Sequence, residues 1–215
     1  MLARIDHTYL RPEGGPAEID RLCDEAVAHR LGAVCVQPLW VARAAARLRG
    51  TGVRAVSVVG FPHGAETAQV KALEARRAVA DGADELDMVI AYGALRAGLD
   101  RLVEEEIRAV VAAGVPVKCI LETGALDEAA MDRGCDLAER AGARYVKTST
   151  GFGPGGASVA VVRRLRARVG DRLGIKAAGG IRSLADLLAL GEAGADRFGT
   201  SHGAAIAREL EALPG

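Results

Sequence analysis

One segment of the chain reads Ala141-Gly142-Ala143-Arg144-Tyr145-Val146-Lys147-Thr148-Ser149. Gly142 follows a charged stretch with helical periodicity, and glycine can take the left-handed conformation that ends a helix. The next residues are largely apolar and β-branched, which is typical of a buried strand. The segment therefore predicts a helix, a turn at Gly142 and a strand that carries Lys147 to its carboxyl end.

This unit, a charged amphipathic stretch followed by a glycine and a short β-branched run, recurs along the chain. Helical periodicity marks residues 68–80, 99–112, 128–140, 158–168 and 183–190. Strands that follow a glycine are predicted at residues 34–36, 53–59, 85–90, 115–121, 144–148, 175–177 and 196–199. Residues 3–7 are expected to form an eighth strand at the start of the chain.

Near-continuous apolar strands that alternate with helices indicate a parallel sheet covered by helices. Eight such units in 215 residues predict a single (β/α)8 barrel, a TIM barrel, with residues 1–215 as one domain. An open doubly wound sheet is the alternative, which six or seven units would favour. In a barrel the active site lies at the carboxyl ends of the strands, so the residues that close each strand are expected to form one ring.

The composition favours a protein that acts on small molecules. Half of the residues are apolar, 26% are charged and the formal net charge is zero. No run of like charge is long enough to suggest a nucleic-acid or membrane partner. The cysteines at positions 23, 35, 119 and 135 lack the close spacing of a metal or redox motif, and no signal peptide or membrane-spanning run is visible. We therefore expect a cytoplasmic protein with reduced thiols.

The lysines are few, and most lie in strands. Only four of the 28 basic residues are lysines, and Lys118, Lys147 and Lys176 each lie inside an apolar, β-branched segment. Burial lowers the pKa of a lysine and makes the neutral, nucleophilic amine available. Lys147 and Lys176 close neighbouring strands, so each positive charge disfavours protonation of the other. We interpret Lys147 as a nucleophile; the alternatives are a structural ion pair at each lysine, or a phosphate anchor at one of these two.

A carboxylate closes another strand of the predicted barrel. Asp87 lies near the end of the strand at 85–90, and strand alternation places Glu85 on the same face. A buried carboxylate beside lysines can move protons at a carbon next to an imine. The alternative is that the carboxylate only neutralises a lysine, and this applies more readily to Glu85 than to Asp87.

Three glycine-bearing strand ends, at residues 151–153, 178–183 and 199–203, predict a phosphate site. Each leads toward a helix, so backbone N–H groups can face an anion, and loops after the seventh and eighth strands commonly bind phosphate in barrels. Gly199 opens the third of these ends, and Arg182 adds positive charge to the second. Taken alone, each glycine pair is more often a tight turn.

Histidines and a cysteine also lie at predicted strand ends. His7, His63 and His202 lack the spacing of a local metal motif, and a strand-end histidine more often hydrogen-bonds to its own loop. We therefore expect no metal. Cys35 is expected to be a small core residue without a catalytic role.

Five motifs, in the same order along the chain, resemble those of the 2-deoxyribose-5-phosphate aldolases. They are Ile5-Asp6-His7-Thr8, Val59-Gly60-Phe61-Pro62-His63-Gly64, Ala83-Asp84-Glu85-Leu86-Asp87-Met88-Val89, Val146-Lys147-Thr148-Ser149-Thr150-Gly151-Phe152-Gly153 and Lys176-Ala177-Ala178-Gly179-Gly180-Ile181-Arg182. The resemblance runs from end to end. It implies a class I aldolase on a (β/α)8 barrel, without metal or other cofactor, that cleaves 2-deoxy-D-ribose 5-phosphate to acetaldehyde and D-glyceraldehyde 3-phosphate.

The resemblance also implies roles for individual residues. Lys147 resembles the lysine that forms the Schiff base, and Lys176 resembles the second lysine that tunes it. Asp87 resembles the acid/base residue, which works with an ordered water, and Asp6 resembles part of its supporting network. The segments that resemble the family's phosphate-binding loops contain Gly151, Gly179, Gly180, Arg182 and Ser201.

The chain departs from some members of that family at two places. Phe152 stands where some members have a lysine, which changes the charge at that end of the phosphate site. Some members end in a longer tail with a tyrosine that assists proton transfer, whereas this chain ends at Pro214-Gly215, so we expect a tail-assisted step to be absent or replaced. Members often pair through their outer helices, and we therefore expect a homodimer.

Overall fold

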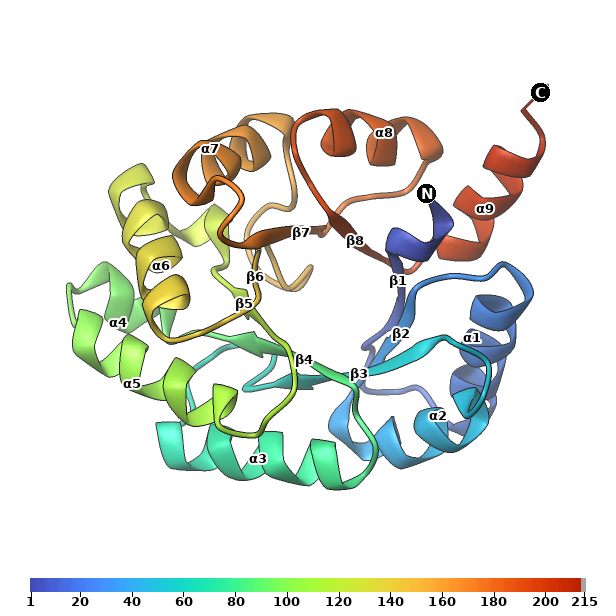
Figure 1. Ribbon diagram of the computed structural model, residues 1–215, viewed down its shortest axis with the longest axis horizontal. Coiled ribbons are helices and arrows are strands. Elements are labelled where there is room, and N and C mark those ends of the chain that lie inside the picture. The colour runs from blue at the N-terminus through green and yellow to red at the C-terminus, as the bar shows by residue number, and fades with distance from the viewer. Residues whose placement is uncertain (214–215) are drawn as a thin grey trace.

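A computed structural model describes residues 1–213, and a closed barrel of eight parallel strands lies at its centre (Figure 1). Each strand pairs with the next one in sequence, and β8 closes on β1 through the pairing of Ile5 with Phe198. The strands are β1 (Ile5–Tyr9), β2 (Ala33–Val36), β3 (Arg54–Val59), β4 (Glu85–Val89), β5 (Val117–Ile120), β6 (Tyr145–Lys147), β7 (Gly174–Ala178) and β8 (Arg197–Thr200). The predicted (β/α)8 barrel is confirmed, and the open doubly wound sheet is wrong.

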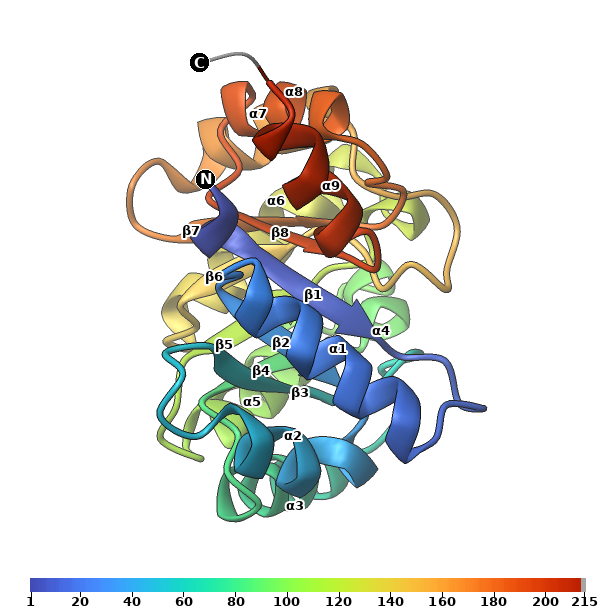
Figure 2. The ribbon, with the colours of Figure 1, turned by 90° about the vertical axis from the view of Figure 1, so that its right-hand side faces the viewer.

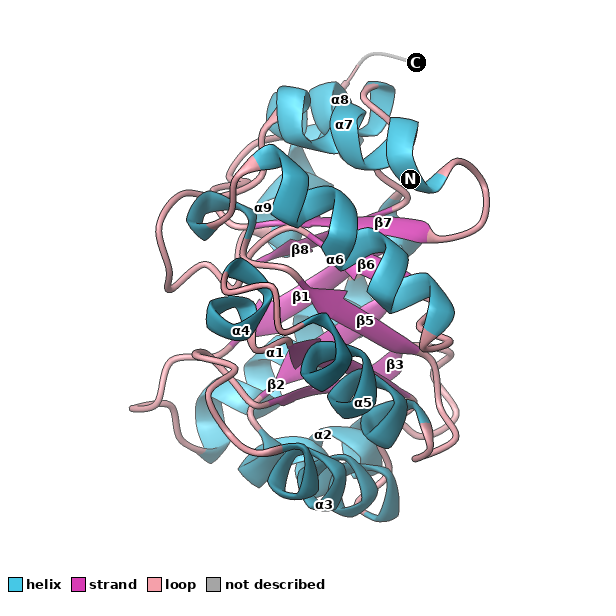
Figure 3. Ribbon diagram, turned by 90° about the vertical axis from the view of Figure 1, so that its left-hand side faces the viewer, coloured by secondary structure: helices cyan, strands magenta, loops and turns pink. Residues whose placement is uncertain are grey.

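Helices surround the barrel on its outer side (Figures 2 and 3). They are α1 (Pro16–Ala28), α2 (Val41–Leu48), α3 (Ala68–Ala80), α4 (Tyr92–Arg96), α5 (Asp100–Val111), α6 (Glu128–Arg140), α7 (Val159–Val169), α8 (Leu184–Glu192) and α9 (Gly203–Glu211), with short 3₁₀ helices η1 (Leu2–Arg4), η2 (Pro38–Trp40) and η3 (Thr123–Ala125). Within residues 1–213, none of these helices combines the length and the apolar character that crossing a bilayer requires. The prediction about a C-terminal tail concerns Pro214 and Gly215, which lie outside the described residues.

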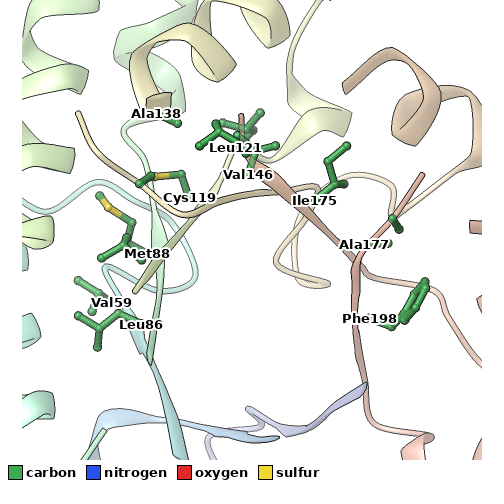
Figure 4. Close-up of a cluster of buried hydrophobic side chains, with 14 of the residues drawn as sticks. Val59, Leu86, Met88, Cys119, Leu121, Ala138, Val146, Ile175, Ala177 and Phe198 are labelled. Atoms are coloured by element: carbon green, nitrogen blue, oxygen red, sulfur yellow. The ribbon is translucent and has the colours of Figure 1, made fainter. Parts of the chain in front are cut away.

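The main hydrophobic core lies between the barrel and the helices (Figure 4). Side chains alternate along a strand, so Leu86 and Met88 on β4 pack outward into this core while Glu85 and Asp87 point into the barrel. A second, smaller apolar cluster contains Leu10, Ala33, Cys35, Val56 and Val58. The interior of the barrel therefore has an apolar side at β2 and β3, and its charged residues come from the other strands.

Two of the glycines that precede strands have a different role from the predicted one. Gly142 takes the expected left-handed conformation, with φ of 86°. Before β2, however, Arg30 takes that conformation (φ 52°), and Gly32 is required because a Cβ there would collide with the carbonyl group of Ala3. Gly174 likewise leaves room for the ring of Tyr145. At these two positions the helix-ending role is wrong, and close packing of the backbone explains the glycine.

Candidate active site

Seven charged side chains from six strands meet inside the barrel. Asp6 on β1 lies 4.0 Å from Lys118 on β5, which shows that the group spans the interior. The members are Asp6, Glu85, Asp87, Lys118, Lys147, Lys176 and Arg197, and each is at most 5% exposed. We call this group the charged cluster; it contains three carboxylates and four cations.

Asp87 lies at the centre of the charged cluster and contacts three lysines. Its Oδ1 accepts a hydrogen bond from Lys118 Nζ at 2.9 Å. Its Oδ2 accepts from Lys147 Nζ at 2.8 Å and from Lys176 Nζ at 2.6 Å. The barrel register produces this arrangement, because Lys147 on β6 is paired directly with Lys176 on β7.

The other two carboxylates balance the remaining cations. Asp6 accepts hydrogen bonds from Lys176 and from Arg197, whose Nε lies 3.1 Å from Oδ1. Glu85 lies 2.5 Å from Lys118 and 3.4 Å from Arg197. Arg54 also reaches Glu85, at 3.0 Å, but its side chain is 43% exposed, so solvent screens its charge.

The charge balance of the cluster points to Lys147 as the lysine that loses its proton. With all seven groups ionised, four cations face three carboxylates, and burying this excess charge costs free energy. Among the described carboxylates Lys147 contacts Asp87 alone, and it shares the accepting oxygen with Lys176. Lys118 and Lys176, by contrast, each lie close to at least two carboxylates. Loss of a proton from Lys147 would make the cluster electrically neutral.

The pKa shifts of Lys147 and Lys176 have opposite directions. Burial lowers the pKa of Lys147, and the neighbouring charge of Lys176 lowers it further, while Asp87 opposes both effects. Burial also acts to lower the pKa of Lys176, but Asp6 and Asp87 outweigh it and raise that pKa above its usual range. Lys176 is therefore a permanent cation at neutral pH, and it favours the neutral amine at Lys147.

The two interior aspartates are ionised. Burial acts to raise the pKa of Asp87, but Lys118, Lys147 and Lys176 hold it well below its usual range. Burial is likewise the largest influence on Asp6, and Lys176, Lys118 and Arg197 together overcome it and lower the pKa of Asp6. Both carboxylates are thus suited to accept hydrogen bonds and to balance charge.

A cavity of about 350 Å³ opens at the carboxyl ends of the strands, and Lys147 is the member of the charged cluster that borders it. The lining comes mainly from the ends of β1, β6, β7 and β8 and from the loops that follow them. Of the residues predicted to bind substrate, it contains Gly151, Gly179, Gly180, Arg182, Gly199 and Ser201. The structure therefore brings the predicted phosphate residues to one cavity, which Lys147 also borders.

Glycines supply the backbone groups at this cavity. Gly179 and Gly180 both have positive φ, at 88° and 82°, and neither amide hydrogen-bonds to another described residue. The amides of Arg182 and Ser183, at the start of α8, instead donate to Asp186. The glycine amides are thus free to donate to an anion, whereas the first amides of α8 are already used. From the sequence, the start of this helix was expected to contribute to the phosphate contact.

Gly199 has a second, steric reason to be glycine. A Cβ at this position would lie 3.0 Å from Cε of Lys176 and 3.1 Å from Cβ of Ala178. Gly199 therefore leaves room for the lysine beneath it as well as bordering the cavity.

Phe152 forms an apolar contact at the mouth of the barrel. Its ring meets Phe61 edge to face, with 5.4 Å between the ring centroids and an angle of 86°. Phe61 comes from the loop after β3 and packs against the interior apolar cluster, whereas Phe152 is 52% exposed. The side of the cavity formed by Phe152 is therefore apolar, and Arg182 borders the cavity from the loop after β7.

Two other strand-end candidates, His7 and Cys35, have different surroundings. His7 hydrogen-bonds to Glu25 of α1 at 2.7 Å, so its side chain faces the surrounding helices. Cys35 points into the barrel, where burial raises the pKa of its thiol to about 11. Cys35 is therefore an uncharged thiol at neutral pH.

Arg197 is the one cluster member that the sequence patterns did not single out. It lies within the run Asp196-Arg197-Phe198-Gly199, and an arginine inside a buried strand was the available signal. Its guanidinium joins Asp6 on β1 to Glu85 on β4 across the floor of the barrel.

Comparisons with known proteins agree with this geometry. Residues 1–209 match the family described as DeoC/LacD family aldolase. The chain is 52% identical over 204 residues to a deoxyribose-phosphate aldolase of Streptococcus pneumoniae (strain Taiwan19F-14), covering 94% of this chain and 93% of that protein.

Solved structures of aldolases have the same fold. The structure entitled "QR15, an Aldolase" has a TM-score of 0.94 and 36% identity, covering 98% of this chain and 95% of that one. The deoxyribose phosphate aldolase from Aeropyrum pernix, described as having a unique tetrameric structure, has a TM-score of 0.91 and 32% identity, covering 99% of this chain and 92% of that one. This chain belongs to the DeoC/LacD family of aldolases.

Proposed function

We propose that this protein is a class I deoxyribose-phosphate aldolase that reversibly cleaves 2-deoxy-D-ribose 5-phosphate to acetaldehyde and D-glyceraldehyde 3-phosphate in deoxyribose phosphate catabolism. Membership of the family and the 52% identity to a deoxyribose-phosphate aldolase support this activity. The observation that carries the mechanism is the position of Lys147. Lys147 borders the cavity, its amine has a lowered pKa, and among the described carboxylates it contacts Asp87 alone.

Lys147 acts as the nucleophile in this proposal. Its neutral amine attacks the aldehyde carbon, C1, of the open-chain sugar, and loss of water gives a protonated imine. The imine accepts the electron pair of the C2–C3 bond as the C3 hydroxyl loses its proton. Glyceraldehyde 3-phosphate leaves, and an enamine of acetaldehyde stays on Lys147. Protonation of C2 and addition of water then release acetaldehyde and restore the amine, so no metal or other cofactor is required.

Asp87, Lys176 and Asp6 manage charge and protons beside the imine. Asp87 does not border the cavity, so the C3 hydroxyl proton reaches its carboxylate through a water molecule. Lys176 keeps its charge because Asp6 and Asp87 hold its proton. As the imine cation forms, Asp87 remains within reach as its counter-ion.

The phosphate group is assigned to the opposite end of the cavity. The amides of Gly179 and Gly180 are assigned to the anion because neither donates to another described residue, and Gly151, Gly199 and Ser201 border the same space. Arg182 supplies the positive charge. This places the aldehyde end of the substrate at Lys147 and its charged end at the glycine loops.

We also propose the organisation of the working enzyme. Residues 1–215 act as one catalytic domain in the cytoplasm, where the four buried thiols stay reduced. Exposed apolar side chains gather on α3 (Val70 and Leu73) and near the start of α5 (Leu99 and Leu102), and these two helices pack side by side. A homodimer through outer helices of this kind would cover them.

The alternatives are a lysine-dependent aldolase for a different phosphorylated sugar and a barrel that only binds a phosphorylated ligand. Cleavage assays with several phosphorylated sugars separate the first from our proposal. The second is disfavoured by the charged cluster, because a passive binder gains nothing from burying three other cations together with the amine of Lys147.

Borohydride reduction in the presence of acetaldehyde tests the mechanism directly. We expect one N-ethyl group, located by peptide mapping on Lys147, and no adduct on Lys147→Met. Circular dichroism must show that Lys147→Met is folded, so that its lack of an adduct reports the missing amine. A folded wild-type protein without any adduct would overturn the class I mechanism. Binding of the sugar phosphate by the wild type without any turnover, with affinity reduced in Lys147→Met, would favour the passive binder.

A further inference from the structure

Glu122 is a buried carboxylate that the charged cluster does not use. It follows β5, is 1% exposed and does not border the cavity. Its backbone adopts a left-handed conformation, with φ of 56° and ψ of 59°. A residue with a side chain is strained there, and such strain persists only where surrounding contacts hold it, often beside a functional site.

The contacts of Glu122 lead to the loop that follows Lys147. Its Oε2 accepts hydrogen bonds from the backbone N–H of Thr150 at 3.3 Å and from the Thr150 hydroxyl at 2.5 Å. The same hydroxyl accepts from the N–H groups of Phe152 at 3.0 Å and Gly153 at 3.2 Å. A hydroxyl has one proton and two lone pairs, so all of its capacity is used. The carboxylate thus fixes the turn at residues 150–153.

Close packing adds to these hydrogen bonds. A Cβ at Gly153 would lie 2.7 Å from the carboxyl carbon of Glu122, and a Cβ at Gly124 would collide with the carbonyl group of Pro154. The loop between β6 and α7 is therefore pressed against the end of β5, and Glu122 lies at the point of contact.

The same loop supports one of the glycines at the phosphate end of the cavity. Ala157 donates its N–H to the carbonyl oxygen of Gly179 at 2.9 Å. A Cβ at Gly156 would lie 2.5 Å from that oxygen. A continuous path of contacts thus runs from Glu122 through Thr150 and the loop to Gly179.

We propose that Glu122 is a positioning residue for phosphate recognition: by holding the loop at residues 150–157, it sets the place of Gly179 and of the cavity wall at Gly151. Glu122 touches neither the reacting atoms nor the cavity, so it acts through Thr150. The inference rests on the proposed function, because it assigns the glycine loops to the substrate phosphate. It predicts that Glu122 controls affinity for the phosphate end and leaves imine chemistry at Lys147 intact.

The test compares Glu122→Ala with Glu122→Gln on 2-deoxyribose 5-phosphate and on 2-deoxyribose. Alanine removes the acceptor, whereas the glutamine amide oxygen can accept the same two hydrogen bonds. For Glu122→Ala we expect KM for the phosphorylated sugar to rise about tenfold, with kcat changed about twofold or less. The ratio of kcat/KM between the two sugars should fall accordingly, and Glu122→Gln should restore most of it.

Gly153→Ala provides a second variant that leaves Glu122 in place. Its new Cβ displaces the carboxylate or the loop, so it should raise the same KM in the same direction. If the two changes act along one path, the double variant Glu122→Ala/Gly153→Ala should lose less than the two single effects combined. This variant keeps the proposal testable if Glu122→Ala does not fold.

Each other outcome contradicts the inference in a definite way. Equal losses on both sugars would mean that Glu122 supports the fold alone, and an unchanged KM in folded Glu122→Ala and Gly153→Ala would remove its role. A loss in Glu122→Gln as large as in Glu122→Ala would show that its charge, and not the hydrogen bonds, is what matters. Borohydride trapping of acetaldehyde is run on every variant as well. If the proposed function were wrong, the wild type itself would form no adduct on Lys147, which distinguishes that case from the results above.

Discussion

Lys147 and Lys176 are direct partners in the pairing of β6 with β7, and their amines donate to the same oxygen of Asp87 at 2.8 and 2.6 Å. Two ammonium groups that share one carboxylate oxygen repel each other, so loss of a proton from one of the two lysines is favoured. Lys176 has the additional partner Asp6, which Lys147 lacks. The pair therefore separates into one permanent cation and one amine that is readily neutral.

The first prediction concerns the pH dependence of Lys176→Met. Lys176 lowers the pKa of Lys147, and its removal also leaves Asp87 freer to hold the proton of Lys147, so the pKa of Lys147 should rise. A raised pKa means less neutral amine at neutral pH, and the acid limb of the kcat/KM profile should move to higher pH. Activity at neutral pH should fall about 10²-fold or more.

Profiles of kcat/KM against pH for wild type and Lys176→Met check this, because they report the pKa values of the free enzyme. Raising the pH should recover part of the activity in the variant. An acid limb that stays in place, or moves to lower pH, would contradict the role assigned to Lys176.

The second prediction concerns the stability of Lys118→Met. Lys118 lies 2.5 Å from Glu85 and 2.9 Å from Asp87, and all three are buried. Removing the cation takes from Glu85 its nearest partner and from Asp87 one of three lysines, while other cations still face both carboxylates. The loss in the free energy of unfolding should therefore stay below about 3–5 kcal/mol, the cost of a wholly unpaired buried charge. Urea denaturation measures this loss.

The matched control for Lys118→Met is Arg101→Ala, which breaks a surface pair. Arg101 is 92% exposed where it meets Glu105 one helical turn away, so solvent screens the interaction. This variant should unfold at nearly the wild-type urea concentration. Equal stability of Lys118→Met and Arg101→Ala would show that the cluster reorganises without cost.

Local patterns were sufficient to predict much of the fold. The helix predicted at 68–80 matches α3 (Ala68–Ala80), and the one at 128–140 matches α6 (Glu128–Arg140). Periodicity and helix-ending residues act over a few positions, so one sequence contains the information. The short helix α4 (Tyr92–Arg96) was not predicted, because five residues are too few for a periodic pattern to stand out.

Contacts between distant parts of the chain could not be predicted in the same way. Lys71 was the one lysine outside an apolar strand, yet it is fully buried in α3 and lies 2.6 Å from Glu106, which is 35 residues away. It also donates to the carbonyl oxygens of Gly64 and Val89. Strand ends show which residues reach the active site, but the register and the closure of the barrel decide which of them meet.

The third prediction concerns recognition of the phosphate by Arg182. Arg182 borders the cavity together with Gly179 and Gly180. Position 152 holds phenylalanine, so no lysine there adds positive charge. In Arg182→Gln, KM for 2-deoxyribose 5-phosphate should rise about tenfold, since charge-assisted hydrogen bonds contribute roughly 1.5–3 kcal/mol. Activity on 2-deoxyribose, which has no phosphate, should stay close to wild type.

Steady-state kinetics on both sugars check this prediction, with Arg163→Gln as the control. Arg163 lies exposed on α7, away from the cavity lining, and its variant should behave as wild type on both substrates. An equal loss on both sugars in Arg182→Gln would place Arg182 outside phosphate recognition.

The fourth prediction is that Gly199→Ala lowers kcat more than it affects binding. Gly199 has no positive φ to protect, so the backbone accepts alanine, but the new Cβ would lie 3.0 Å from Cε of Lys176. Lys176 is fully buried, so making room for the Cβ should shift its amine relative to Asp6 and Asp87. Because a displacement of about 1 Å near the chemistry can reduce the rate about 10²-fold, we expect kcat to fall at least about tenfold.

The control is Gly93→Ala, where a Cβ would meet nothing within 4 Å, and this variant should have the wild-type kcat in the same assay. If Gly199→Ala kept the wild-type kcat and only raised KM, the contact with Lys176 would not matter for the chemistry. Gly199 would then act in substrate binding alone, as part of the cavity wall.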